Sequence, residues 1–120
     1  MELSSEFYLR EATEEDYEAV LNINRNVYTG NDYLPKLYSQ WLKADCRRNF
    51  VITKQTHVVG FFSLSWYRHQ KWTVFVEQAL RIRSDATGQN VSNLVVDWIK
   101  QYIKQYENPV FLSFGSKFTF

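Results

Sequence analysis

The sequence has 120 residues, of which 45% are hydrophobic and 22% charged, a balance typical of one small globular domain and not of a disordered chain. The net charge of +1, with Arg47–Arg48 as the only adjacent basic pair, gives no electrostatic reason to expect nucleic acid or an anionic membrane as a partner. One cysteine and two histidines match no zinc pattern, and no apolar run approaches the roughly 20 residues that span a bilayer, so we expect no metal and a reducing, cytoplasmic location.

The first third of the chain is predicted to contain one strand and two helices. A short strand is expected at Phe7–Arg10. Thr13 is followed by three acidic residues, which is typical of a helix N-terminus, and an apolar stripe at helical spacing then continues to near Arg25. Turn residues at 28–32 precede Pro35, which suits the first turn of a second helix.

The middle of the chain changes to a period of two, which predicts three strands. Phe50–Thr53 and Val58–Trp66 flank a polar turn and are typical of a hairpin, and a third strand is expected at Trp72–Arg83. The apolar alternation of this third strand breaks at Gln78, which indicates either a β-bulge or a buried amide with a partner.

A long amphipathic helix and a last strand complete the predicted elements. The helix is expected from about Val91 to Tyr106, and Val110–Phe114 follows as a strand. The buried face of the helix is predicted to comprise Val91, Val95, Trp98, Tyr102 and Tyr106. The order β-α-α-β-β-β-α-β is α/β, and a crossover helix between the fourth and fifth strands predicts that these two strands are parallel.

A polar loop with one glycine, Gly88, separates the fourth strand from this helix, and such an order can bind a phosphate. A helix N-terminus offers unpaired backbone N–H groups and the positive end of the helix dipole. The strand before the loop carries Glu77, a candidate general base. Plain loop formation also explains Gly88. A solvent-facing side chain also explains Glu77, as does an ion pair with a neighbouring arginine such as Arg81, which lies on the same face if no bulge intervenes.

This strand, loop and helix resemble the acyl-CoA-binding core of the GNAT N-acyltransferase superfamily. The resemblance implies a GNAT-like fold with a mixed sheet flanked by helices. It also implies that acetyl-CoA is held through its pantetheine arm by backbone groups around Leu80, Arg81 and Ile82, and through its pyrophosphate by Thr87, Gly88, Gln89, Asn90, Val91 and Ser92. The family usually has Gly or Ala where this chain has Asn90 and Ser92, and no Arg or Lys lies within Ala86–Ser92, so we expect weaker CoA binding than in a complete family member.

A narrower resemblance comes from the D-Y-L-P…Y…W-L cluster in Asp32–Leu42, which is similar to the N-terminal half of histidine N-acetyltransferases and their close relatives. It implies acetyl-CoA-dependent N-acetylation of a small amine, such as the α-amino group of histidine or a similar amino acid. Asp32 and Tyr33 match the segment that closes over the acceptor in GNAT proteins, although an ordinary helix entry also explains them. Glu77 matches the acidic residue that removes a proton from the amine, and a carboxyl group in an apolar strand can have a raised pKa suited to that task. The relatives have one residue fewer between this Glu and the Leu-Arg pair.

A complete GNAT domain continues past the fifth strand with another helix and further strands, so the resemblance implies that residues 1–120 form a single, partial domain. The phenylalanine-rich stretch Val110–Phe120 is an uncovered strand of the kind that pairs with a second copy, and we expect a homodimer through it. One competing interpretation is a non-catalytic GNAT-like remnant that binds CoA or a partner chain. Another is a structural α/β module unrelated to acyl transfer.

Overall fold

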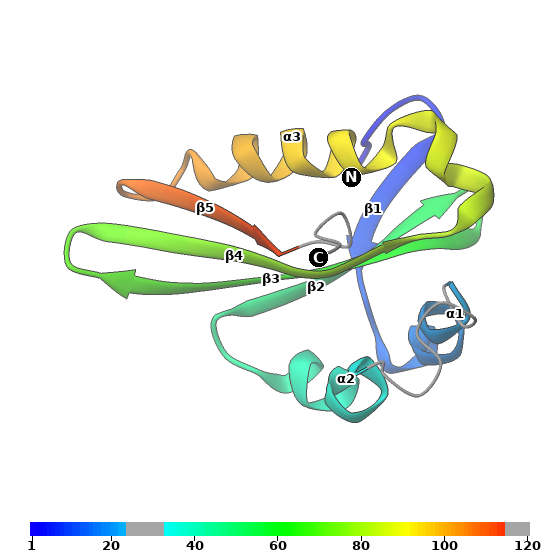
Figure 1. Ribbon diagram of the computed structural model, residues 1–120, viewed down its shortest axis with the longest axis horizontal. Helices are drawn as coiled ribbons and strands as arrows, with labels where there is room; N and C mark the ends of the chain where they lie inside the picture. The colour runs from blue at the N-terminus through cyan, green and yellow to red at the C-terminus, as the bar shows by residue number, and fades with distance from the viewer. Residues whose placement is uncertain (24–32, 115–120) are drawn as a thin grey trace.

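Helices cover both faces of a single sheet in the computed structural model, which describes residues 1–23 and 33–114 (Figure 1). The sheet of the described residues has the order β1-β2-β3-β4-β5, with bounds β1 Phe7–Glu11, β2 Arg47–Lys54, β3 His57–His69, β4 Trp72–Ile82 and β5 Pro109–Phe114. Helices α1 (Tyr17–Asn22) and α2 (Leu34–Lys43) lie on one face, here called the α1/α2 face, and α3 (Val91–Ile103) lies on the other, the α3 face. Short 3₁₀ turns, η1 (Glu14–Asp16) and η2 (Ser84–Gln89), precede α1 and α3.

The predicted element order and the mixed sheet are confirmed. The strands β1 to β4 pair antiparallel in sequence order, whereas β4 and β5 pair parallel from Thr73↔Pro109 to Gln78↔Phe114. This is the pairing that a crossover helix between them requires. The predicted end of the first helix near Arg25 and the turn at 28–32 lie outside the described residues.

Side-chain alternation along the strands creates two separate cores. Phe61 and Phe62 are adjacent in β3 and fully buried, but they point to opposite faces. Phe62 packs with Phe50 under α3, whereas Phe61 packs with Tyr38 under α2.

The buried face of α3 differs from the predicted one. Its buried residues are Val91, Val95, Ile99 and Ile103. The predicted core residues Trp98, Tyr102 and Tyr106 are only partly buried and flank this stripe. The reason is chemical, since a large ring with a polar tip packs well at the edge of a core while its tip finds a hydrogen bond, here between the hydroxyls of Tyr102 and Tyr106 at 3.3 Å.

A β-bulge interrupts β4 at Ala79. The register with β3 shifts by one residue between Ser63↔Gln78 and Phe61↔Arg81, and Ala79 has a φ of 61°. Glu77 pairs with Leu64, which belongs to the core under α3, whereas Arg81 pairs with Phe61 on the other face. The bulge interpretation of the broken pattern is therefore confirmed. The alternative of an ion pair between Glu77 and Arg81 required a strand without a bulge, and the bulge places the two side chains on opposite faces.

The start of α1 is held by the carboxylate of Asp16, as the acidic first turn predicts. Asp16 accepts two hydrogen bonds from the guanidinium of Arg10, at 2.8 and 2.9 Å, and one from the backbone N–H of Thr13 at 2.9 Å. The hydrogen bonds from Arg10 hold the pKa of Asp16 below its ordinary value, against the opposing effect of partial burial.

We expect Asp16→Asn to lower the free energy of unfolding by about 1–2 kcal/mol at pH 7, a value kept small because Arg10 is half exposed. A carboxylate with a lowered folded-state pKa stabilises the fold above its unfolded-state pKa, and this contribution disappears as the pH falls through the folded-state pKa. The difference between wild type and variant should therefore shrink below about pH 4. Urea unfolding of wild type and variant at pH 7 and below about pH 4 measures this difference in the free energy of unfolding. Asp45→Asn, at an exposed site, is the control, and a difference that stays constant with pH would contradict this role.

Candidate functional site

The stretch of β4 beyond the bulge is here called the open edge. The described pairing with β5 extends to Gln78↔Phe114, whereas pairing with β3 continues through Arg81 and Ile82. On the β5 side, the backbone from Ala79 to Ile82 therefore has no neighbouring strand among the described residues. Leu80 points into the core under α3 and Arg81 is buried on the other face, so both anchor this open stretch. It is the stretch predicted to hold pantetheine.

The loop after β4 leads directly to the N-terminus of α3. Thr87, Gly88 and Gln89 lie in η2, and Asn90 has the left-handed conformation, with φ 58° and ψ 32°. The first hydrogen bond within the helix runs from the N–H of Leu94 to the carbonyl of Asn90 at 3.1 Å, so the N–H groups of Val91 and Ser92 precede the helical ladder. Asparagine is among the few residues other than glycine that adopt this backbone conformation readily. The unexpected Asn90 therefore preserves the turn.

Asn90 still carries a side chain where the loop would approach a phosphate, and the segment offers no cation. We expect Asn90→Gly combined with Thr87→Arg to tighten CoA binding at least about threefold, because glycine removes that side chain and arginine pairs with phosphate. Calorimetric titration of wild type and variant measures the difference. The control is Gln105→Arg, which adds the same charge at an exposed position just past the C-terminal end of α3, and an equal gain in both variants would contradict the placement of the pyrophosphate at this loop.

Glu77 lies in β4 two residues before the bulge and is completely buried on the α3 face. Its Oε1 accepts a hydrogen bond of 2.5 Å from the hydroxyl of Ser113, the residue beside it in β5. The carboxylate thus belongs to the last described pair but one of β4 and β5. The predicted alternative of a solvent-facing Glu77 is wrong, since the apolar alternation of β4 turns it inward.

A polar cluster occupies the α1/α2 face beside the bulge. Arg47, the first residue of β2, donates to the hydroxyl of Ser63 at 2.6 Å and to the side-chain carbonyl of Gln78 at 2.9 Å. Its guanidinium lies 4.1 Å from the ring centroid of Trp41 in α2. Burial lowers the pKa of Arg47, while the nearby Tyr33 phenol acts in the opposite direction. Gln78 thus has the partner that the second sequence interpretation required.

Of the two predicted acceptor residues, the structure describes only Tyr33. Tyr33 directly precedes α2, is 45% exposed, and packs edge-to-face on Trp41 at 6.0 Å between ring centroids. Asp32 lies outside the described residues. The polar cluster therefore contains one predicted residue, Tyr33, together with Arg47, which was not predicted as a site residue.

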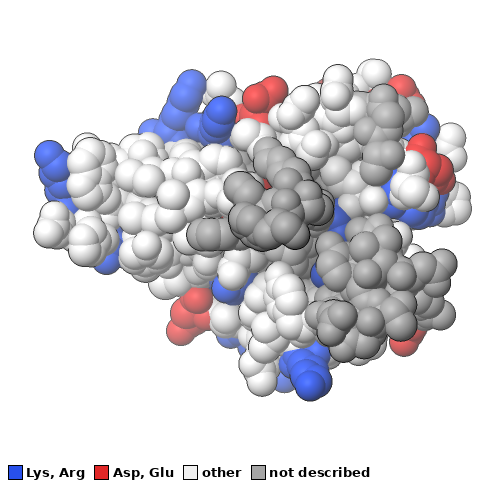
Figure 2. Space-filling model, viewed as in Figure 1, with Lys and Arg blue, Asp and Glu red and all other residues white. Residues whose placement is uncertain are grey.

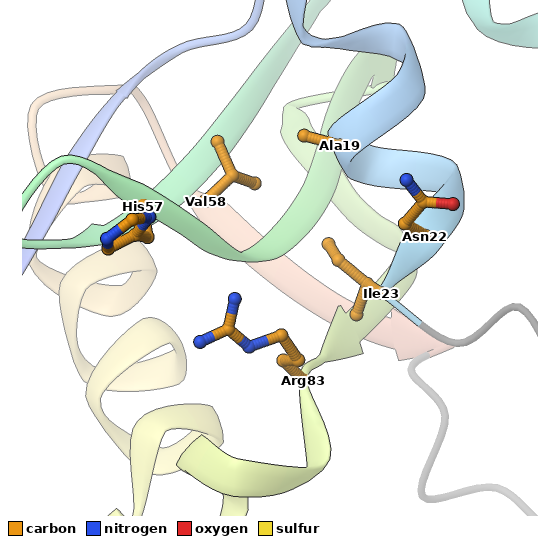
Figure 3. Close-up of a pocket in the computed structure, with 6 residues that line it drawn as sticks. All are labelled: Ala19, Asn22, Ile23, His57, Val58 and Arg83. Carbon is orange, nitrogen blue, oxygen red and sulfur yellow. The ribbon is translucent and has the colours of Figure 1, made fainter.

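A small open pocket of about 250 Å³ lies next to the end of β4 and the loop that follows it (Figure 3). Ala19, Asn22 and Ile23 of α1 form one wall, and His57 and Val58 form another. The side chain of Arg83 extends into the space between them, but its guanidinium also binds Asp85 through two hydrogen bonds of 2.7 and 2.8 Å. None of the predicted site residues lines this pocket.

Two further classes of site are absent from residues 1–23 and 33–114. No group of three or more histidine, cysteine or acidic side chains is arranged to hold a metal ion there. No helix in these segments is long and apolar enough to cross a membrane.

Solved structures with the same arrangement of elements are mostly acetyltransferases. A possible acetyltransferase from Clostridium difficile 630 has a TM-score of 0.73, with 18% identity over 91% of this chain and 78% of that one. A transcriptional regulator from Bacillus halodurans C-125 has a TM-score of 0.74, with 17% identity over 93% of this chain and 84% of that one. A predicted acetyltransferase from Clostridium acetobutylicum, solved with acetyl-CoA, has a TM-score of 0.64 and 8% identity, over 88% of this chain and 80% of that one. The protein therefore has the fold of the GNAT acetyltransferases.

Among proteins of known name, its sequence is similar to histidine N-acetyltransferases. It is 29% identical to histidine N-acetyltransferase of Scomber australasicus over 93 residues, which are 78% of this chain and 27% of that protein. It is 35% identical to the human probable N-acetyltransferase 16 over 94 residues, 78% of this chain and 25% of that protein. The chain thus spans about a quarter of the length of these relatives. No family model matches the sequence.

Proposed function

We propose that the protein is an acyl-CoA-dependent N-acetyltransferase that acetylates a small amine, with the α-amino group of histidine or a similar amino acid as the acceptor and acetyl-CoA as the cosubstrate. The observation that carries this proposal is the open edge of β4. It begins at the bulge beside Glu77 and leads directly to the N-terminus of α3. The similarity to histidine N-acetyltransferases supports the choice of acceptor.

The open edge and the helix N-terminus fit the two ends of one elongated cosubstrate. Backbone groups of Leu80–Ile82 that point toward the β5 side would hydrogen-bond the amides of the pantetheine arm, as a neighbouring strand would. The N–H groups of Val91 and Ser92, with the positive end of the α3 dipole, would bind the pyrophosphate. Both sets of contacts use main-chain groups, which are present whatever the side chains. Most of these contacts could therefore form although the loop sequence differs from that of the family.

In the proposed reaction the amine nitrogen attacks the thioester carbonyl, the carbon–sulfur bond breaks, and coenzyme A leaves as the thiolate, which then takes up a proton. The attacking amine must lose one proton before and one after it forms the new bond. Glu77 would accept a proton directly or through one water molecule, which is the reach of a general base. Ser113 orients its carboxylate from β5.

Thiol release from acetyl-CoA tests the proposal. The 120-residue chain is expected to release coenzyme A in the presence of histidine, with N-acetylhistidine detected by mass spectrometry. Acetyl-CoA without an amine is the control for hydrolysis. Failure to bind acetyl-CoA in a calorimetric titration, or binding without thiol release for every amine tested, would contradict the proposed enzyme.

A second candidate is a non-catalytic GNAT-like protein that binds a partner chain, including a second copy, along β5. This strand forms the edge of the described sheet and carries no charged residue, and Leu112 is 41% exposed. The left part of the molecule in Figure 2, where β5 lies in Figure 1, shows mostly uncharged residues, with Lys and Arg at its tip. Binding of acetyl-CoA without turnover, together with a concentration-dependent dimer in sedimentation velocity that Leu112→Lys abolishes, would favour it. A monomer at all concentrations would exclude the homodimer.

A further inference from the structure

Arg47 differs from three other arginines of the chain because its described hydrogen-bond partners are all neutral. Arg10, Arg48 and Arg83 each bind a carboxylate, namely Asp16, Glu11 and Asp85. Arg47 makes no ion pair among the described residues, and its hydrogen bonds go to a hydroxyl and an amide. A partly buried cation of this kind loses hydration without gaining an opposite charge. An anion beside Arg47 would supply that charge.

The guanidinium of Arg47 is held in one orientation. The hydroxyl of Ser63, which accepts from Arg47, donates to the side chain of Asn49 at 2.7 Å, and Asn49 in turn donates to the backbone carbonyl of Trp41 at 2.9 Å. The ring of Trp41 covers one face of the guanidinium. These contacts use two of its five N–H donors, and the other three have no acceptor among the described residues. A planar, oriented guanidinium with free donors is suited to bidentate binding of a carboxylate.

The position of Arg47 is also informative, because its partner Gln78 directly precedes the bulge. The open edge of β4, where the thioester would lie, begins at the next residue. The exposed ring of Tyr33, a predicted acceptor residue, packs edge-to-face with the same Trp41. An acceptor bound here would have its anionic group at Arg47 and an adjacent amine directed toward the bulge. In an α-amino acid these two groups are separated by a single carbon.

We propose that Arg47 binds the α-carboxylate of the acceptor, so that free α-amino acids are acetylated in preference to amines that lack this carboxylate. This inference rests on the proposed function for the reaction and adds to it a specificity-determining residue. Trp41 and Ser63 act as positioning residues that hold the guanidinium in place.

The experiment compares histidine with histamine, which has the same ring but no carboxylate, in the thiol-release assay. Wild type should have a kcat/KM for histidine at least about tenfold higher than for histamine, since one charge-assisted contact of this kind corresponds to at least that factor. Arg47→Lys keeps the charge but loses the fork of donors. It should raise KM for histidine about tenfold and leave kcat/KM for histamine within about twofold. Arg48→Lys, the next residue on the opposite face, is the matched control and should keep the preference.

Equal kcat/KM for histidine and histamine in wild type would overturn the role of Arg47 while leaving the acetyltransferase proposal intact. An equal loss for both amines in Arg47→Lys would overturn it too, because that pattern reports a structural defect. If the variant does not fold, the wild-type comparison alone decides. Calorimetric binding of N-acetylhistidine and N-acetylhistamine gives the same comparison without turnover, so equal affinity would refute the carboxylate contact even in a chain that is not an enzyme.

Discussion

Replacing Glu77 with glutamine is expected to lower kcat for amine acetylation by about a hundredfold or more and to leave the affinity for acetyl-CoA within about twofold. The amide keeps the size of the side chain and can still accept the hydrogen bond from Ser113, but it cannot take up a proton. Glu77 is buried in the last described pair but one of β4 and β5, next to the open edge of β4 where the thioester would lie under the proposed function. Thiol-release kinetics and calorimetry on the same preparation give both quantities.

The control for this substitution is Ser113→Ala. It removes the hydroxyl that binds the carboxylate but leaves the carboxylate itself, so it should cost much less than Glu77→Gln. Unchanged turnover in Glu77→Gln would remove this residue from the mechanism. A matching loss of acetyl-CoA affinity would instead make Glu77 a structural link between the two strands.

The largest stability effect is expected for Phe62→Ala, which should lower the free energy of unfolding by about 3–5 kcal/mol. Phe62 is fully buried, stacks on Phe50 with 5.1 Å between ring centroids, and meets Trp98 of α3 edge-on at 6.4 Å. The cavity left behind would lie where β2, β3 and α3 meet. These elements are held by their other contacts, so they cannot shift far enough to fill the cavity. Denaturant unfolding followed by tryptophan fluorescence measures the change.

Tyr67→Ala is the matched control for Phe62, because it also removes an aromatic ring from β3 but at a position that is 51% exposed. It should cost less than about 1 kcal/mol. Comparable losses in the two variants would contradict the placement of Phe62 at the centre of the α3-side core.

The element order and the parallel pair could be predicted because each depends on local sequence patterns. Apolar spacing identified α2 and α3, alternation identified β2 to β4, and the crossover rule then fixed the direction of β5. The face to which each residue of β4 points could not be fixed in the same way. It depends on the bulge at Ala79, an alanine with a positive φ, and no glycine marks the site.

The polar cluster around Arg47 also lay beyond sequence analysis. Its two hydrogen-bond partners are 16 and 31 residues away along the chain, so the cluster exists only once the register of three strands is known. The one available signal was the adjacent pair Arg47–Arg48. In a strand, neighbouring side chains point to opposite faces, so two adjacent cations cannot form one patch. The structure accordingly places Arg48 against Tyr102 of α3 and Arg47 against Trp41 of α2.

Because of the bulge at Ala79, β4 could lose one residue and every other side chain would still point to the same face of the sheet. Gln78 and Ala79 lie on the same face, so a chain without Ala79 would alternate regularly and still direct Glu77, Leu80 and Ile82 toward α3. Such a deletion would bring the loop before α3 nearer to Glu77 by up to about 3 Å, the rise of one strand residue. The bulge therefore sets the spacing between the carboxylate and the N-terminus of α3. Under the proposed function, a single alanine would adjust that spacing to the fixed length of the pantetheine arm.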